Sequence, residues 1–423
     1  MTGQEAIAYI HSYNWLGSKP GLERTQELLE RMGHPEKGLR FVHVLGTNGK
    51  GSTSAMLASV LQAAGYVTGL YTSPYLARFH ERMQVNGVPI TDEELAQATE
   101  ATRPFAEAMA QHPTEFELVT AVAFTYFRQK GCDIVVLEAG LGGRLDSTNA
   151  IPSPEAVVLT RIGLDHTAEL GNTQEAIAAE KAAVVKPGCS VVAYQQDASV
   201  MEVFEEACRR ADTRMRTADF SQLRVLQDNL EGQVFDYGAL EGLRIALLGP
   251  HQRCNAAVVI ETVQALRERG WVITEDALRQ GLTQARWPGR FELVSRSPRF
   301  IVDGGHNPQC AQSVADGLQD YFPGEKAVFL IGVLADKDYR SLTACLAPLA
   351  KCFVTVTPDS GRALEAAELG RLLEEAYGLP VTVCQSIEQG VETAKKLAGP
   401  EGLAVSVGSL YLTGAVRTCF GLT

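Results

Sequence analysis

A glycine-rich turn near the N-terminus is the feature that most constrains the fold. The segment HVLGTNGKGSTS, residues 43–54, leads from an apolar run into glycines around Lys50 and then into the helical pattern AMLASVLQAAG. Glycines at 46, 49 and 51 make room for a polyphosphate, because backbone N–H groups can converge on its oxygens and a helix N-terminus adds partial positive charge. The segment predicts a phosphate-binding loop; the alternative is an ordinary strand-to-helix turn with a surface lysine.

This loop departs from the usual phosphate-binding pattern GxxxxGK[ST]. Gly51 follows Lys50 in place of a hydroxyl residue, and Val44 stands where the first glycine is expected. Three glycines, the lysine, Ser52 and Thr53 between an apolar β run and a helical pattern still favour nucleotide binding.

From residue 41 to about 248, short β-rich runs alternate with helical patterns, which is typical of parallel α/β domains. The expected strands are FVHVLG, VTGLYT, DIVVLEAG, AVVLTRIG and SVVAY, and the expected helices include STSAMLASVLQAAG and TEFELVTAVAFTYFRQKG. Alternating runs separated by turn residues at 222–248 predict a small antiparallel meander.

A second alternation starts near residue 300 with RFIVDGG, AVFLIGVL, CFVTVTP, PVTVC and LAVSVGS. The short, polar, proline-bearing segment SRSPR at 295–299 suggests a link between domains. We therefore predict an α/β protein. An N-terminal P-loop ATPase-like domain, residues 1–295, has a mostly parallel sheet, and a C-terminal Rossmann-like α/β domain spans 299–423.

Composition narrows the class of protein. The length of 423 residues exceeds the usual size of one core, and 45% hydrophobic with 21% charged residues is ordinary for a soluble protein. The sequence lacks a long apolar run and a signal-peptide pattern, so a cytoplasmic protein with no membrane partner is expected. A net charge of −12 argues against nucleic-acid binding, and a monomer is expected. Nine single cysteines without a CxxC pair predict buried thiols.

Eight motifs occur in order along the chain. They are HVLGTNGKGSTS, YTSPYLARFHERM, LEAGLGGRLDSTN, GLDHTAELG, EKAAVVKPG, WPGRFE, DGGHNP and GSLYLTG. Over about residues 5 to 415 the chain resembles the folylpolyglutamate synthase and dihydrofolate synthase branch of the Mur ligase superfamily. The resemblance implies an enzyme that uses ATP to join L-glutamate to dihydropteroate or to the γ-carboxylate of a reduced folate, through an acyl phosphate.

The resemblance assigns a nucleotide site to both domains. The implied ATP-binding residues are Gly46, Thr47, Asn48, Gly49, Lys50, Gly51, Ser52, Asn255, Arg290, Asp303 and His306. The motif DGGHNP also has a logic of its own, because Asp303 ends a strand, two glycines allow close approach, and Asn307-Pro308 can start a helix. Gly305 stands where the family usually has alanine.

Glu138 ends an apolar run, which places a carboxylate at the carboxyl edge of the predicted sheet. A carboxylate there suits Mg²⁺, which prefers oxygen ligands and arrives with ATP; the alternative is a strand-end residue that caps the next loop. The resemblance implies Ser73, Glu138 and His166 as ligands of one or two magnesium ions. Without it, His166 would more simply be a structural histidine.

Lys181 lies on an amphipathic pattern, where a lysine is normally solvated. The resemblance implies that this lysine is carbamylated and that Lys50, Lys181 and His166 are catalytic.

The resemblance also implies a pterin site at Leu22, Thr114, Phe116 and Asp146. Phe116 could stack on a flat ring or simply belong to the core. Ser147 replaces the usual alanine. The irregular segment TSPYLARFHERM resembles a mobile loop beside the phosphate-binding loop, and a plain surface loop is the alternative.

Other functions make different predictions. A P-loop kinase or GTPase would not need the second α/β unit, and the guanine-reading NKxD pattern does not occur. A non-catalytic nucleotide-binding module would not carry the complete set of implied metal ligands. A sister Mur enzyme for nucleotide-linked cell-wall precursors would carry a further N-terminal domain, for which the roughly forty residues before the loop are too few.

Overall fold

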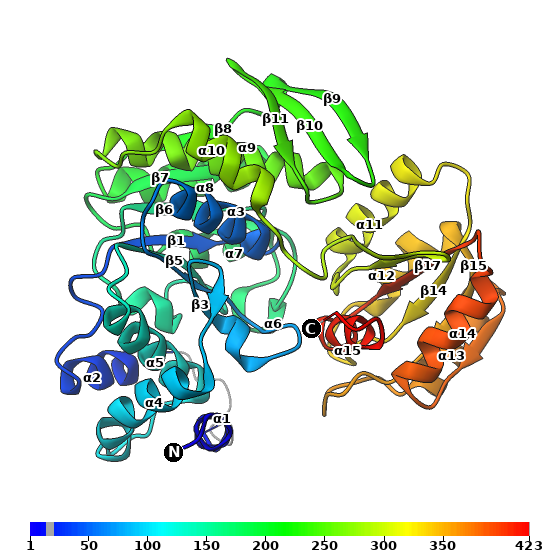
Figure 1. Cartoon of the computed structure of the whole chain (residues 1–423), viewed down its shortest axis with the longest axis horizontal. Coiled ribbons are helices and arrows are strands. Elements are labelled where there is room, and N and C mark those ends of the chain that lie inside the picture. Colours follow the sequence, from blue (N-terminus) through cyan, green and yellow to red (C-terminus); the bar gives the residue numbers. More distant parts are fainter. Residues whose placement is uncertain (14–20, 423) are drawn as a thin grey trace.

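The computed structural model describes residues 1–13 and 21–422, and it forms two α/β lobes that lie side by side (Figure 1). The larger lobe contains an eight-stranded sheet of order β4-β3-β2-β5-β1-β6-β7-β8, in which β3 pairs antiparallel with both β2 and β4 and the other neighbouring strands pair parallel. The strands are β1 (Phe41–Leu45), β2 (Thr68–Tyr71), β3 (Met83–Val85), β4 (Val88–Pro89), β5 (Ile134–Glu138), β6 (Ala156–Leu159), β7 (Ser190–Tyr194) and β8 (Met215–Ala218). The predicted mostly parallel sheet is confirmed.

Helices cover both faces of this sheet, so β1 is buried along its whole length. Val42 and Val44 pack in one core with α3, α9 and α10, whereas Phe41 points to the other face and contacts Phe124 of α5. The helices of this lobe are α1 (Gly3–His11), α2 (Glu23–Arg31), α3 (Lys50–Ala63), α4 (Asp92–Glu107), α5 (Glu115–Gln129), α6 (Thr167–Leu170), α7 (Gln174–Ala182), α8 (Ala198–Arg210), α9 (Pro250–Glu268) and α10 (Glu275–Gln284). The 3₁₀ turns among the described residues of this lobe are η2 (Phe79–Arg82), η3 (Ser147–Ala150) and η4 (Phe220–Gln222).

The predicted meander is present as a separate three-stranded antiparallel sheet. Its strands are β9 (Leu223–Asn229), β10 (Gly232–Tyr237) and β11 (Leu240–Ile245). Phe235 and Leu243 bury one face of the meander in the core shared with α9 and α10, which fixes it to the larger lobe.

The smaller lobe has a six-stranded sheet of order β12-β13-β17-β14-β15-β16, parallel except for β12. Residues of α11, α12 and α13 share a core on one face, and residues of α14 and α15 share another core on the opposite face. The strands are β12 (Glu292–Arg296), β13 (Arg299–Val302), β14 (Ala327–Ile331), β15 (Ala350–Thr355), β16 (Val381–Val383) and β17 (Leu403–Val407). The helices are α11 (Pro308–Tyr321), α12 (Tyr339–Leu346), η5 (Ala347–Leu349), α13 (Ala366–Tyr377), α14 (Ile387–Ala398) and α15 (Leu410–Cys419).

The segment 295–299, which the sequence suggests as the link between domains, forms the turn between β12 and β13. These two strands pair antiparallel and both belong to the smaller lobe. A short polar stretch with proline is as typical of a tight turn as of a linker, so composition did not separate the two. We propose that the division lies before β12, at residues 285–291.

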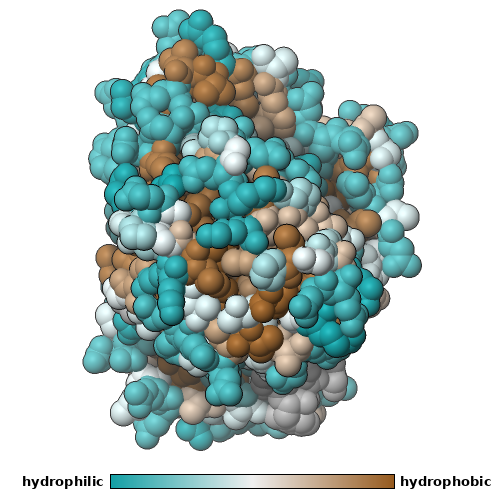
Figure 2. Space-filling view, turned by 90° about the vertical axis from the view of Figure 1, so that its right-hand side faces the viewer, coloured by the Kyte–Doolittle hydropathy of each residue, from teal (hydrophilic) through white to brown (hydrophobic). Residues whose placement is uncertain are grey.

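The surface and the thiols complete the description. Figure 2 shows that hydrophilic residues cover most of the side of the molecule it displays, with smaller groups of hydrophobic residues between them. Among the described helices, none combines the length and the apolar character needed to cross a membrane. All nine cysteines are free thiols, and five of them are buried.

Candidate active site

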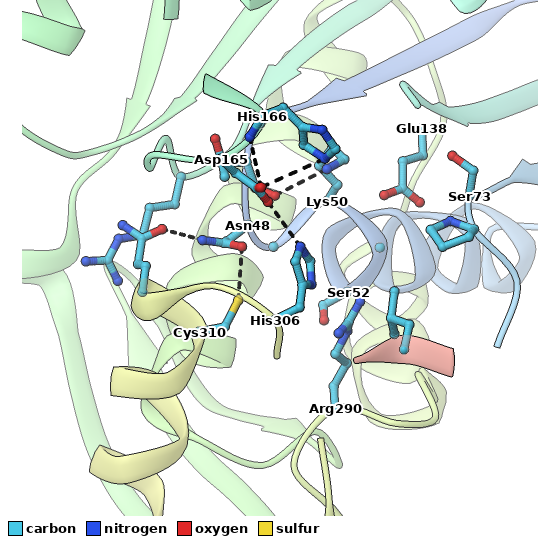
Figure 3. Close-up of a pocket in the computed structure, with 18 of the residues that line it drawn as sticks. Asn48, Lys50, Ser52, Ser73, Glu138, Asp165, His166, Arg290, His306 and Cys310 are labelled. Atoms are coloured by element: carbon cyan, nitrogen blue, oxygen red, sulfur yellow. Dashed lines mark hydrogen bonds and ion pairs between the residues drawn. The ribbon is translucent and has the colours of Figure 1, made fainter. Parts of the chain in front are cut away.

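The carboxyl ends of strands from both sheets meet at one cavity of about 390 Å³ (Figure 3). In the larger lobe the loop 46–49 follows β1, Ser73 follows β2 and Glu138 ends β5. In the smaller lobe Asp303 follows β13. Ligands of α/β proteins bind at such edges, because loops and helix N-termini converge there.

This cavity brings together the residues that the sequence assigns to nucleotide, metal and catalysis. Those lining it are Gly46, Thr47, Asn48, Gly49, Lys50, Gly51, Ser52, Ser73, Glu138, His166, Lys181, Asn255, Arg290, Asp303 and His306. Their proximity is a property of the fold, whereas their individual roles stay predictions.

Packing inside the protein also favours glycine in this loop. A Cβ on Gly46 would lie 1.9 Å from Oγ1 of Thr160, and a Cβ on Gly51 would lie 2.6 Å from the indole of Trp287. Gly49 has φ +86° and begins α3, so a glycine fits its left-handed backbone. Gly46 and Gly51 therefore also have a packing reason to lack a Cβ atom, and the interpretation that the three glycines make room for polyphosphate stays a prediction.

The loop is held by α9 of its own lobe. Gln252 Nε2 donates to Ser52 Oγ at 3.2 Å, and Asn255 Nδ2 donates to Gln252 Oε1 at 3.0 Å. Lys50 Nζ donates to the carbonyl oxygen of Thr47 at 3.2 Å. These bonds orient a cation and a helix N-terminus toward the cavity.

Asn48 connects the loop to the smaller lobe. Its Oδ1 accepts from Cys310 Sγ at 3.0 Å, and its Nδ2 donates to Gln309 Oε1 (Figure 3). The same Oδ1 also accepts from Asn307 Nδ2 at 3.1 Å. The three partners lie at the start of α11, so this loop contacts both lobes.

Asp165 is the centre of a second link between the lobes, and the sequence analysis did not single it out. Its Oδ2 lies 3.0 Å from His306 Nε2, and its Oδ1 lies 2.6 Å from Lys337 Nζ. Burial would raise the pKa of Asp165, but the bonds and charges of His306 and Lys337 outweigh burial and lower it. The sequence could have indicated this pair, because Asp165 adjoins His166 in the segment after β6 and Lys337 lies in the segment after β14.

Asp303 has a structural role that its motif did not reveal. Its Oδ2 accepts from the backbone N–H of Phe291 at 2.7 Å, and its Oδ1 accepts from that of Gly305 at 2.6 Å. Burial raises the pKa of Asp303 even though Arg290 lowers it. The carboxylate thus ties the segment that enters the smaller lobe to the cavity wall.

Glu138 and Ser73 lie together at one side of the cavity (Figure 3) and fit a magnesium ion. Burial raises the pKa of Glu138, and the charges of Lys50 and Arg290 only partly oppose it. A divalent cation would compensate this buried carboxylate, and the Ser73 hydroxyl is a further oxygen donor. The described residues contain no group of three His, Cys, Asp or Glu able to hold a metal alone, so phosphate and water oxygens would complete the shell.

His166 is oriented differently from the expectation for a third ligand. The residue has φ +50° before α6, and its Nε2 lies 3.4 Å from Lys337 Nζ. Burial and the Lys337 charge lower the pKa of His166. In this arrangement Nε2 of His166 faces an ammonium group, and a role of His166 as a third metal ligand stays a prediction.

Lys181 is buried, so a solvated role is wrong. The residue is 5% exposed, and a Cβ on Gly143 would lie only 2.9 Å from its Cα, which shows how closely the loop after β5 packs on α7. Burial, assisted by the Lys50 charge, lowers the pKa of Lys181 to about 7. A large share of this amine is therefore neutral near neutral pH.

A second cavity, of about 430 Å³, adjoins the first and is lined by Thr114, Phe116 and Asp146. The half-buried Phe116 ring lies over Gly140, where a Cβ would approach it to 2.5 Å. Thr114 caps α5 with its hydroxyl. Leu22, the fourth residue predicted for the pterin site, is not among the described residues that line this cavity.

A third cavity, of about 800 Å³, was not anticipated. It lies along the loop 72–78 and α3, and Arg78, Arg286, Arg290 and Arg417 contribute positive charge. Ser73 and Pro74 line all three cavities, so this point of the loop is their junction. The segment TSPYLARFHERM, residues 72–83, is not wholly irregular as expected, because η2 lies in its second half and β3 begins at its last residue.

Comparison with known proteins agrees with this geometry. The Mur ligase middle domain matches residues 44–263, and the Mur ligase glutamate ligase domain matches residues 289–410. The chain is 38% identical to a dihydrofolate synthase/folylpolyglutamate synthase of Bacillus subtilis over 98% of both chains. It is 35% identical to the folylpolyglutamate synthase of Lacticaseibacillus casei over 99% of this chain and 98% of the relative.

Solved structures give the same result. Folylpolyglutamate synthase of Mycobacterium tuberculosis, complexed with ADP and AMPPCP, superposes with a TM-score of 0.90 at 30% identity, over 100% of this chain and 99% of that one. The Escherichia coli protein in complex with DHPP and ADP gives a TM-score of 0.88 at 29% identity, over 100% and 98%. The chain is an ATP-dependent ligase and belongs to the folylpolyglutamate synthase and dihydrofolate synthase branch of the Mur ligase superfamily.

Proposed function

We propose that this enzyme joins the carboxylate of a pteroyl compound to the α-amine of L-glutamate with hydrolysis of ATP to ADP and phosphate. The observation that carries the proposal is the junction of cavities. The nucleotide cavity and the cavity beside Phe116 share Ser73, Pro74 and residues 140–142. A flat acceptor bound in one cavity would therefore present its carboxylate to a γ-phosphoryl group bound in the other.

The chemistry needs activation because a carboxylate has no good leaving group. A carboxylate oxygen attacks the γ-phosphorus, the bond to the bridging oxygen breaks, and ADP departs. The neutral amine of glutamate then attacks the acyl carbon, loses a proton, and expels inorganic phosphate to leave an amide. Both steps concentrate negative charge at oxygen atoms, which preorganised donors stabilise.

The chain supplies these donors at the loop. Lys50 and the backbone N–H groups at the start of α3 would balance charge on the transferring phosphoryl group, and Arg290 lines the same cavity from the segment between the lobes. Glu138 and Ser73 would hold Mg²⁺, which when bound neutralises charge on the triphosphate.

We further propose that both dihydropteroate and reduced folates are substrates, as the names of the Bacillus subtilis and Escherichia coli relatives say of those proteins. The test incubates pure protein with ATP, Mg²⁺ and labelled glutamate, and with dihydropteroate or tetrahydrofolate in separate tubes. Labelled amide product and ADP in both tubes would support two reactions. A phosphorylated product without glutamate would instead indicate a kinase, and product only from a different carboxylic acid would indicate another Mur-type ligase.

Carbamylation of Lys181 is a separate proposal. It is supported by burial of the amine and by a pKa lowered to about 7, since the neutral amine is the form that reacts with carbon dioxide. Enzyme prepared with ¹³C-bicarbonate should show a carbamate carbonyl signal that Lys181→Met lacks. An unmodified Lys181 in fully active enzyme would overturn the proposal.

A further inference from the structure

His43 lies in the middle of β1, fully buried, and contacts the second cavity only indirectly. Its Nε2 lies 2.8 Å from Oγ1 of Thr148, and that hydroxyl forms a short hydrogen bond with Oδ1 of Asp146. Asp146 lines the cavity, whereas His43 and Thr148 lie behind it. We infer that His43 is a positioning residue that fixes Asp146, through the Thr148 hydroxyl, for recognition of the flat heterocycle of the pteroyl substrate.

The direction of the hydrogen bonds follows from the available protons. The Asp146 carboxylate only accepts: Oδ1 takes the backbone N–H of Thr148 at 3.0 Å and its hydroxyl, and Oδ2 takes the N–H of Leu141 at 2.7 Å. Because the Thr148 hydroxyl donates its proton to Asp146, it can only accept a hydrogen bond from His43. His43 must therefore carry its proton on Nε2.

The other ring nitrogen supports a specific role for histidine at this position. Nδ1 of His43 is buried and has no hydrogen-bond partner among the described residues. An unpaired buried nitrogen lowers stability, and the neighbouring buried residues Val42 and Val44 have no side-chain nitrogen. Burial, with a smaller effect of the Lys186 charge, lowers the pKa of His43 to about 3, so the ring stays neutral. A histidine here leaves one nitrogen unsatisfied and is explained by what the other nitrogen donates.

The chain of bonds preorganises an acceptor. Three protein donors hold the Asp146 carboxylate, yet a carboxylate offers about four lone-pair positions, so one remains for a ligand. A heterocycle that presents an N–H group suits such an acceptor. His43, Thr148 and Asp146 all belong to the larger lobe, so movement between lobes does not break the chain of bonds.

The inference rests on the proposed function, and kinetics can test it residue by residue. His43→Leu should raise KM for dihydropteroate about tenfold while kcat and KM for ATP change less than about twofold. His43→Gln should recover most of the loss, because its amide N–H can replace Nε2–H. Thr148→Val should resemble His43→Leu, and the double variant should be no worse than Thr148→Val alone.

Outcomes that overturn the inference differ from those that overturn the function. An unchanged KM for dihydropteroate in His43→Leu, additive losses in the double variant, or equal losses for ATP would refute positioning through Thr148. Thermal unfolding of each variant identifies any that fail to fold. ¹⁵N NMR of histidine-labelled enzyme needs no activity: it should show His43 protonated at Nε2, and protonation at Nδ1 would refute the inference. Absence of amide product with wild-type enzyme would instead refute the proposed function.

Discussion

The two adjoining cavities differ in how the chain builds them. The nucleotide cavity takes its walls from both lobes, with the loop 46–52 on one side and Asp303, His306 and Lys337 on the other. Among the described residues, those that line the cavity beside Phe116 lie between 73 and 180 of the larger lobe. A change in the angle between lobes would therefore alter the first cavity and leave the second intact. If ATP and the acceptor bind in these two cavities, we expect closure of the lobes to affect ATP binding and to leave acceptor binding unchanged.

The largest effect should come from Lys50, which serves the reaction common to both substrates. Lys50→Ala should abolish activity with dihydropteroate and with tetrahydrofolate, a loss of roughly a thousandfold or more, because the charge of the transition state loses a cation. Glutamate-dependent ADP release measures the loss, and thermal unfolding should match wild type. Unequal losses for the two acceptors would show that the reactions do not share one nucleotide site.

Glu138 lies where the nucleotide cavity meets the third cavity. Glu138→Ala should abolish both activities, and Glu138→Gln should lower kcat by roughly a hundredfold and weaken Mg²⁺ dependence, since an amide compensates a cation poorly. Both Glu138 variants should bind dihydropteroate with the affinity of the wild-type enzyme in calorimetry. An active Glu138→Ala enzyme would contradict the metal assignment. The fold should stay intact, because the substitution removes a buried carboxylate whose charge the neighbouring residues only partly compensate.

A substitution at Asp165 tests whether the nucleotide cavity can be altered without affecting the cavity beside Phe116. Asp165→Asn should raise KM for ATP about tenfold with KM for dihydropteroate unchanged, because the link to His306 and Lys337 belongs to the nucleotide cavity alone. Initial rates at varied ATP and at varied acceptor measure the two constants.

Glu155 provides a matched control. It is also buried and paired with two cations, at 2.5 Å from Arg40 Nη1 and 2.6 Å from Arg269 Nε, but all three residues belong to the larger lobe. Glu155→Gln should lower stability without changing KM for ATP. Equal effects of both variants on KM would mean that general destabilisation, and not the link between lobes, controls nucleotide binding.

The sequence predicts most of what lies within one lobe. Apolar β runs that end in glycine or in a polar residue placed Gly46, Glu138 and Asp303 at strand ends, and the strands lie where these patterns indicate. The meander was equally readable, since alternating runs separated by turn residues pair locally. Local patterns suffice here because each involves residues close in the chain.

Contacts between distant segments were not readable in this way. Asp165 and Lys337 follow strands of different sheets, and their pairing depends on how two lobes face each other. Trp287 packs against Gly51 and thereby explains a glycine that the loop pattern attributes to phosphate. Lys181 looks solvated by its helical pattern, but the loop after β5 covers it. Each case requires tertiary packing that one sequence does not encode in its periodicity.

A substitution at Phe116 makes the complementary test, since it alters the second cavity and not the nucleotide cavity. Phe116→Leu should raise KM for dihydropteroate about fivefold and leave KM for ATP unchanged, because an aromatic face at the cavity wall is lost. Phe124→Leu, a change in the fully buried core of the same helix, should lower the unfolding temperature without a selective effect on this KM. If Phe116→Leu changed KM for ATP as well, the two cavities would not be independent.

The smallest expected effect is the pH dependence of the link at Asp165. His306 and Lys337 hold the pKa of this carboxyl below its ordinary value in the folded protein, despite burial, so folding favours the ionised form. The stabilisation is therefore complete above the unfolded pKa of about 3.9 and is lost as pH falls through the lower folded value. The unfolding free energy of wild type should exceed that of Asp165→Asn by roughly 2 kcal/mol between pH 5 and 7, and the difference should shrink below pH ~4. Urea titrations of both proteins across this range measure it; a difference that instead grew toward low pH would mean that Asp165 is protonated in the folded enzyme and does not hold the lobes together by charge.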